Sequence, residues 1–274
     1  MSGGRFVFDG VEYDLENPID ISIPLRFDGP QPNAYGVEPA SAEPVRAGEL
    51  IGDTRRGGSC NFERFTLVPH CNGTHTEGVG HLTHERISVR DSLKDVFVRA
   101  VLISVVPSPA KMAGETYPVE FGEDDWLITR ESLQNALAVV RNDGNEVAFE
   151  AVIVRTVPNN DAKLERVYAG DPMPAYFSTE AMEFIVELGI SHLLVDLPSI
   201  DRLFDDGKLS NHRIFWKIET QVFHVSPESR IDATITELVY APSEVPDGEF
   251  LCNLQISPFA SDASPSRPLL FRKA

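Results

Sequence analysis

The chain has 274 residues, enough to bury one sizeable core, and we expect a single domain over residues 1–274. Its 42 acidic and 24 basic residues give a formal net charge of −18, which disfavours nucleic acid and anionic membranes as partners. The sequence begins without the features of a secretory signal and contains no apolar stretch near the ~20 residues of a membrane span. Three cysteines are too few for a disulfide framework, so we expect a cytoplasmic protein.

The first part of the chain is rich in short β-strand patterns. Residues 5–8 and 11–15 predict a hairpin, because Asp9-Gly10 between them suits the positive φ angles of a type I′ turn. A further strand is expected at residues 19–25. Residues 26–60 are rich in proline and glycine and show little periodicity, which predicts a long excursion of loops.

Strands and helices then alternate. Apolar runs predict strands at residues 97–106, 149–157 and 190–197, and another strand pattern covers residues 230–240. Apolar residues at helical spacing predict one helix at residues 130–140, capped by Thr129, and another at residues 178–189, capped by Ser178 or Thr179 and ended by Gly189. This order indicates an α/β or α+β fold with a mixed β-sheet.

Four of the seven histidines lie in PHCNGTHTEGVGHLTH, residues 69–84. On an extended segment His75 and Glu77 point to the same side, and Gly78 and Gly80 would let the chain bend to bring His81 back to them. Imidazole with carboxylate is a ligand set for Zn²⁺, Mn²⁺ or Fe²⁺. On spacing alone, hydrogen-bonded histidines and a chance His-x-Glu triplet are an equally good interpretation.

The surrounding sequence favours the metal. GTHTEGVGH resembles the HxGTHxDxPxH signature of the putative cyclase family, metal-dependent hydrolases that include bacterial kynurenine formamidase and isatin hydrolase. The segments PIDISIPL, YFSTEAMEFIVELGISHLLVDLPSID, NHRIFW, ATITELVYAP and DASPSRPLLF are similar to further family segments in the same order. The resemblance runs from about residue 19 to 271 and is more specific than the first motif alone.

This resemblance implies a swivelling β/β/α-type fold that forms a homodimer or homotetramer and holds one or two divalent metals, Zn²⁺ or Mn²⁺. By register, His75 corresponds to a ligand of the first metal, Glu77 to a bridging carboxylate and His212 to a ligand of the second metal. Glu237 resembles the second bridging carboxylate and would also hold the attacking hydroxide in line. His81 corresponds to the catalytic acid/base histidine.

Two positions depart from the family pattern. Glu77 replaces an aspartate, and the extra methylene can alter the metal separation or turn a bridge into a terminal ligand. The family's first ligand falls on Cys71, whose thiolate would bind and favour Zn²⁺. His70 stands beside it, but on a strand it could substitute only through a slip of one residue, which would reverse its facing direction.

Weaker candidates are expected to be structural. We interpret His84 as a residue at the rim, His192 as a satisfied core histidine and His224 as exposed. Asp201 either hydrogen-bonds a ligand histidine or caps the turn at residues 202–204. The remaining thiols, Cys60 and Cys252, are interpreted as buried and apolar.

Two functions remain open from the sequence. The first is hydrolysis of a small-molecule amide, formamide, lactam or lactone by metal-activated water, with His81 as acid/base. The second is a non-catalytic module of the same fold that binds a metal or a small ligand, which the substitutions at positions 71 and 77 motivate. The retention of His81, which a structural metal site would not need, favours the enzyme.

Overall fold

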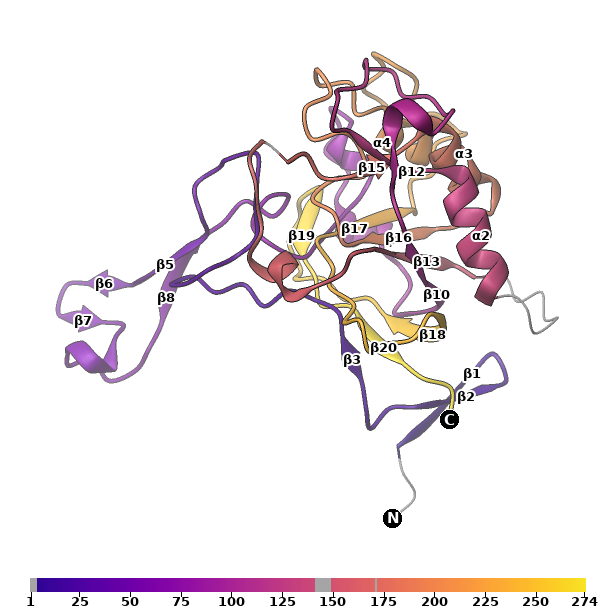
Figure 1. Cartoon of the computed structure of the whole chain (residues 1–274). Coiled ribbons are helices and arrows are strands. Elements are labelled where there is room, and N and C mark those ends of the chain that lie inside the picture. Colours follow the sequence, from indigo (N-terminus) through magenta and orange to yellow (C-terminus); the bar gives the residue numbers. More distant parts are fainter. Residues whose placement is uncertain (1–3, 141–148, 171) are drawn as a thin grey trace.

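A computed structural model of the chain describes residues 4–140, 149–170 and 172–274. Its centre is a nine-stranded mixed sheet with the strand order β19-β9-β17-β16-β13-β10-β18-β20-β3 (Figure 1). The strands are β3 (Ile19–Asp20), β9 (His75–Glu77), β10 (Phe97–Val105), β13 (Ala151–Thr156), β16 (His192–Val195), β17 (Thr234–Glu237), β18 (Gly248–Asn253), β19 (Ala263–Pro265) and β20 (Leu269–Phe271). β10, β13, β16 and β17 run parallel, and the flanking strands pair antiparallel.

The parallel strands are buried on both faces, as their continuous apolar runs require. Three helices, α2 (Arg130–Val140), α3 (Thr179–Glu187) and α4 (Ser210–Trp216), cover one face (Figure 1). Their apolar side chains form the main core with alternate residues of the parallel strands. On the other face the sheet curls, so that Phe250, Cys252 and Leu270 pack with Ala100 and Leu102. The prediction of a mixed sheet with helices packed on it is confirmed.

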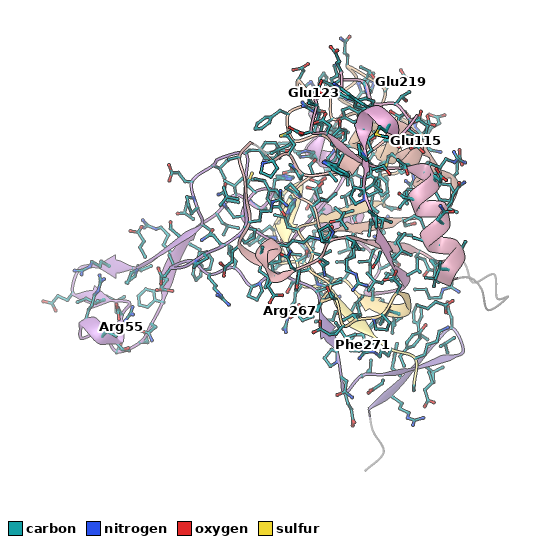
Figure 2. The ribbon with its side chains drawn as sticks, in the orientation of Figure 1. Arg55, Glu115, Glu123, Glu219, Arg267 and Phe271 are labelled. Atoms are coloured by element: carbon teal, nitrogen blue, oxygen red, sulfur yellow. The ribbon has the colours of Figure 1, made fainter. Side chains whose placement is uncertain are left out.

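Smaller elements surround this body. They are β1 (Arg5–Phe8), β2 (Val11–Asp14), β4 (Asn33–Ala34), β5 (Ser41–Pro44), β6 (Arg46–Ala47), β7 (Leu50–Ile51), η1 (Thr54–Arg56), β8 (Glu63–Thr66), η2 (Val79–His81), α1 (Val89–Ser92), β11 (Ser108–Pro109), η3 (Ala110–Met112), β12 (Trp126–Ile128), η5 (Asp161–Glu165), β14 (Val167–Tyr168) and β15 (Tyr176–Phe177). Residues 41–66 form an arm, built on the antiparallel pair β5 and β8, that extends away from the body. Arg55 marks its tip in Figure 2.

Most expected elements are present. Asp9 and Gly10 join β1 to β2 with φ angles of 47° and 78°, as the type I′ prediction requires. The helix predicted at residues 130–140 has those bounds, and Thr129 Oγ1 accepts the backbone N–H of Ser132 at 3.0 Å. α3 is capped by the Ser178 hydroxyl, as expected.

Three expectations were wrong in detail. The strand expected at residues 19–25 is regular only at Ile19–Asp20 and continues as a single antiparallel bridge between Ser22 and Val239. Asp20 Oδ1 accepts both the backbone N–H and the hydroxyl of Ser22, a local pattern that competes with strand pairing. The excursion at residues 26–60 is not only loops, since it contains β4 to β7. Cys60 is exposed, because it lies in the arm, away from every core cluster, whereas Cys252 is buried as predicted.

Among the described residues, no helix combines the length and the apolar character needed to cross a bilayer.

Candidate metal centre

The pairing of β9 with β17 builds the floor of the candidate site. The register sets His75 opposite Glu237, and Glu77 lies two residues further along β9. All three side chains are buried. They offer ligand atoms that all lie within 4.8 Å of one another, and His75 Nε2 is 3.5 Å from Glu237 Oε2. The i, i+2 spacing noted in the sequence therefore does bring an imidazole and a carboxylate to one point.

His212 reaches the same point from the first turns of α4. Its Nε2 lies 3.0 Å from Glu77 Oε1 and 3.7 Å from Glu237 Oε1. Glu237 Oε1 also accepts the backbone N–H of Ile200 at 2.9 Å, which fixes the orientation of that carboxylate. The four predicted residues His75, Glu77, His212 and Glu237 thus converge although His212 and Glu237 are distant in sequence from the other two.

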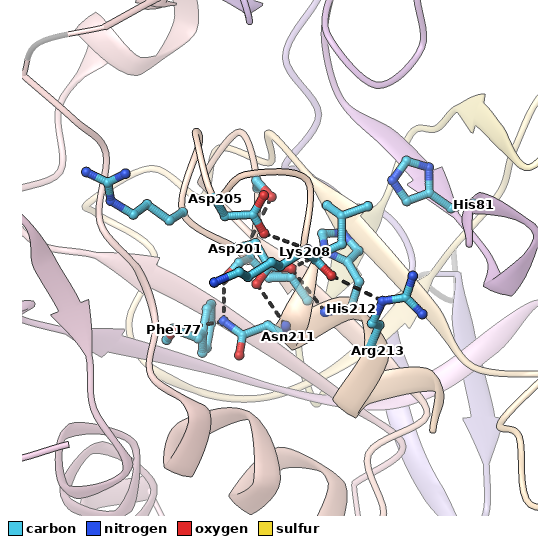
Figure 3. A network of polar contacts seen from close by, with 12 residues as sticks. His81, Phe177, Asp201, Asp205, Lys208, Asn211, His212 and Arg213 are labelled. Carbon is cyan, nitrogen blue, oxygen red and sulfur yellow. Dashed lines mark hydrogen bonds and ion pairs between the residues drawn. The ribbon is translucent and has the colours of Figure 1, made fainter. Parts of the chain in front are cut away.

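Asp201 sets the orientation of His212. Its Oδ2 lies 2.6 Å from His212 Nδ1 and accepts the backbone N–H of His212 at 3.1 Å, while Oδ1 accepts the backbone N–H of Asn211 (Figure 3). Of the two roles open from the sequence, the hydrogen bond to a histidine is the one observed. Asp201 also caps backbone N–H groups, but these belong to the start of α4 and not to the turn at residues 202–204. Because Asp201 accepts from Nδ1, the Nε2 lone pair faces the carboxylates.

His81 and His70 form a second group with Glu77, again with ligand atoms within 4.8 Å. His81 Nδ1 lies 3.9 Å from Glu77 Oε2, and His70 Nδ1 lies 2.8 Å from the same oxygen. Both histidines also contact Asp262, at 3.5 Å from His81 Nδ1 and 3.0 Å from His70 Nε2. No motif in the sequence points to Asp262. Asp262 immediately precedes β19, whose pairing with β9 brings it beside Glu77.

The glycines act differently from the expectation. Gly78 and Gly80 do not adopt positive φ angles, and η2 returns His81 as a 3₁₀ turn. Gly80 is needed for space, because a Cβ there would lie 2.0 Å from the carbonyl oxygen of Ile87.

Cys71 has a different environment. Its side chain is buried in an apolar cluster that includes Ile23, Leu238 and Tyr240, and it belongs to neither group of candidate ligands. Burial and the nearby Glu237 carboxylate raise the pKa of the Cys71 thiol to about 11. Residues 69–71 form a turn and not a strand, so His70 faces Glu77 without a register slip, and the expectation that it needs one was wrong. Ligation by Cys71 stays a prediction.

The charges of the side chains in the centre favour the binding of a cation. Burial alone would raise the pKa of Glu77, but the imidazoles of His81 and His212 hold it well below its usual value. Burial would likewise lower the pKa of His70, but its contacts with Asp262 and Glu77 raise that pKa to about 10. The Glu77 carboxylate is therefore ionised and attracts cations.

The donor set fits a divalent metal. Within the described part of the chain, His75 Nε2 and Glu77 Oε1 are buried and lack a partner in hydrogen-bonding geometry. His75 Nδ1 donates to the Gly73 carbonyl at 3.0 Å, so Nε2 presents a lone pair. Buried polar atoms without partners are rare and costly, and a cation would satisfy both at once.

A cavity of about 500 Å³ opens onto this centre. Glu77, His81, His212 and Glu237 line its floor. Its walls contain apolar and polar residues that no sequence motif marks, among them Tyr35, Ser199, Leu203, Phe204 and Leu209. Tyr35 belongs to the excursion at residues 26–60, and its ring meets that of Phe204 edge-on with centroids 6.2 Å apart. Burial and the carboxylates, Glu237 first among them, raise the pKa of Tyr35, so its phenol stays neutral.

The other histidines lie outside the centre. His84 is exposed and stacks on Phe223 with ring centroids 5.1 Å apart, and His224 is exposed. His192 is buried in the core, as expected, with Nδ1 2.8 Å from Thr234 Oγ1. It is not fully satisfied, because its Nε2 is buried without a hydrogen-bond partner among the described residues.

A family model described as putative cyclase matches residues 13–202. None of the curated proteins compared with the chain matches it. Among solved structures, isatin hydrolase A from Ralstonia solanacearum is 18% identical over 94% of this chain and 92% of its own, with a TM-score of 0.61. Isatin hydrolase A from Labrenzia aggregata, bound to benzyl benzoate, is 15% identical over 94% of both chains, with a TM-score of 0.60.

A third structure is described as a predicted metal-dependent hydrolase from Bacillus stearothermophilus. It is 15% identical over 93% of this chain and 98% of its own, with a TM-score of 0.57. At these identities the likeness establishes a shared fold.

Proposed function

Because the chain belongs to the putative cyclase family, we propose that it is a metal-dependent hydrolase of a small amide, formamide, lactam or lactone. One observation carries the proposal. Ligand atoms of His75, Glu77 and Glu237 converge within 4.8 Å, with two buried atoms unpartnered, at the floor of a cavity of small-molecule size.

The metal would be held by His75, Glu77, His212 and Glu237, and the imidazole and carboxylate donors suit Zn²⁺ or Mn²⁺, one or two per chain. A bound divalent cation supplies Lewis acidity, which makes water a stronger nucleophile at neutral pH and polarises a carbonyl oxygen. Glu237, fixed by the Ile200 N–H, would hold the nucleophile in line with that carbonyl.

His81 would move the proton. Its side chain is 24% exposed and lines the cavity, whereas the proposed ligands His75 and His212 are 0% and 2% exposed. Because Nδ1 faces Asp262 and Glu77, Nε2 would accept a proton from water and return it to the leaving nitrogen or oxygen.

The cavity walls favour a small substrate with an apolar body. Tyr35 and Phe204 provide aromatic surface, and the hydroxyl of Ser199 and the neutral phenol of Tyr35 provide polar groups that could orient a carbonyl compound. Isatin hydrolases of the same fold are named for a bicyclic lactam, which makes lactams the first compounds to test.

The test is a substrate panel with a defined metal. The purified protein is stripped with a chelator, reloaded with Zn²⁺ or Mn²⁺, and assayed with N-formyl arylamines, lactams and lactones. We expect metal-dependent hydrolysis of one class, abolished in His81→Ala and retained in His224→Ala, which removes an exposed histidine. Full metal loading with no hydrolysis in any class would instead support the non-catalytic binding module.

The oligomeric state and the cellular location are also proposals. We propose a homodimer or homotetramer located in the cytoplasm. Exposed apolar side chains on the arm, Leu50 and Phe65, support association with a second copy. Light scattering on the purified protein measures the assembly, and fractionation of expressing cells measures the location.

A further inference from the structure

Three histidines around Glu77 share one arrangement. In His75, Nδ1 donates to the Gly73 carbonyl, and in His212, Nδ1 lies 2.6 Å from the Asp201 carboxylate, so each presents Nε2 to the centre. An imidazole whose outer nitrogen is bound by an acceptor has its inner lone pair oriented for a metal.

His70 has the same arrangement with its nitrogens exchanged. Its outer Nε2 lies 3.0 Å from Asp262 Oδ2, and its inner Nδ1 lies 2.8 Å from Glu77 Oε2. His81 differs, because its Nδ1 lies 3.5 Å or more from both carboxylates and no acceptor binds its other nitrogen among the described residues. The histidines around Glu77 therefore divide into three oriented ones and one that is free to exchange a proton.

The turn at residues 69–71 explains why position 70 and not 71 faces the centre. Cys71 packs against apolar side chains that include Ile23 and Leu238, whereas His70 points to Glu77 and Asp262. A thiol enclosed by apolar neighbours lacks the positive surroundings that favour a thiolate ligand.

We infer that His70 takes the metal-ligand position that the family motif assigns to residue 71, and that Asp262 is the positioning residue that holds its ring. This inference deepens the proposed metal site and rests on it. Cys71 then has a packing role only.

The glutamate at position 77 fits the same arrangement. Its Oε2 lies nearest His70 and its Oε1 nearest His212, so one carboxylate can join ligands on both sides of the centre. On this view the two departures from the motif, at positions 71 and 77, are linked. The ligand moves from position 71 to His70, and the carboxylate that it meets is one methylene longer, because Glu77 replaces an aspartate.

The test measures metal affinity and does not use turnover. Zn²⁺ and Mn²⁺ affinities are determined by competition with a chromophoric chelator for the wild type, His70→Ala, Cys71→Ala, Asp262→Asn and the control His84→Ala. We expect Cys71→Ala and His84→Ala to bind as the wild type does. Asp262→Asn should bind ~10–100-fold more weakly, the usual effect of removing a partner of a ligand histidine, and His70→Ala should lose more.

A spectrum of the wild-type protein loaded with Co²⁺ gives an answer that does not depend on variant folding. Ligation by His70 predicts no thiolate-to-cobalt charge-transfer band in the near ultraviolet, whereas ligation by Cys71 predicts one. Far-ultraviolet circular dichroism of each variant identifies those that fail to fold, for which the cobalt spectrum decides.

The outcomes separate this inference from the proposed function. A charge-transfer band, or loss of metal in Cys71→Ala but not in His70→Ala, overturns the inference and leaves a metal-dependent hydrolase intact. Metal binding that needs His70 in a protein that hydrolyses nothing supports the inference and contradicts the proposed function. A wild-type protein that binds no metal overturns both.

Discussion

Metal binding should stabilise the folded chain by an amount that can be calculated in advance. The native centre buries His75 Nε2 and Glu77 Oε1 without hydrogen-bond partners in the described structure, and an unfolded chain has no such site. A ligand that binds only the native state stabilises it by RT ln(1 + [L]/Kd), ~2.7 kcal/mol at a concentration 100 times Kd.

The expected shift in melting temperature follows from the length of the chain. An unfolding entropy of ~2.1 cal/mol/K per residue, applied to 274 residues, gives about 0.6 kcal/mol/K, so 2.7 kcal/mol raises Tm by about 5 °C. Differential scanning fluorimetry of chelator-treated protein, titrated with Zn²⁺ or Mn²⁺, measures this shift. Ca²⁺, which prefers oxygen ligands, should give a much smaller one.

A matched pair of variants locates the effect. His75→Ala should remove the metal-dependent part of Tm, and His224→Ala, which changes an exposed histidine, should keep it. If Tm does not respond to either metal in the wild type, or rises equally in His75→Ala, the reasoning about this centre is wrong.

Three further outcomes are expected. His81→Ala should lower turnover by ~10²–10⁴-fold while metal content, measured by elemental analysis, is retained; loss of metal would make His81 a ligand. Gly80→Ala should destabilise the fold by about 1–3 kcal/mol in urea unfolding, because its Cβ would lie 2.0 Å from the Ile87 carbonyl oxygen; an unchanged midpoint contradicts this. Burial raises the pKa of Asp125, but hydrogen bonds from Arg202, the Gly122 N–H and Tyr176 together lower it below its usual value. The ionised carboxylate therefore stabilises the fold above about pH 4, and this stabilisation is lost as the pH falls through the folded-state pKa. Asp125→Asn should flatten that acid dependence of Tm.

The sequence predicts the parts of the centre that depend on local geometry. The i, i+2 relation of His75 and Glu77 follows from the period of a strand, and the helices at residues 130–140 and 178–189 follow from apolar spacing and caps. His212 and Glu237 could be selected only through the family resemblance, because nothing local links them to β9.

The missed residues depend on geometry that spacing does not encode. Asp262 comes beside Glu77 through the pairing of β19 with β9, across more than 180 residues of chain. Strand alternation before His75 predicts that His70 faces away from the centre, whereas residues 69–71 form a turn that breaks the alternation. The segment DASPSRPLLF is similar to a family segment, but its first residue, Asp262, becomes a candidate only when the partner strand of β19 is known.

The position of the centre in the sheet follows from its mixed topology. Glu237 is the last residue of β17, and Ser199 and Asp201 lie in the loop that leaves the carboxyl end of β16. Open sheets commonly place their sites at the carboxyl ends of parallel strands, where loops diverge. Here antiparallel β9 joins that edge and adds His75 and Glu77 from a rigid strand.

The residues of the centre are held in two different ways, by strand pairing and by a turn. His75, Glu77 and Glu237 are fixed by strand pairing, so moving any of them would disturb the sheet itself. His70 is held by a turn, and a turn can present a different residue when its conformation changes slightly. On the inference that His70 is a ligand, the turn supplies a ligand whose position could shift by one residue while the sheet stayed the same. The contacts of His70 with Glu77 and Asp262 support that inference.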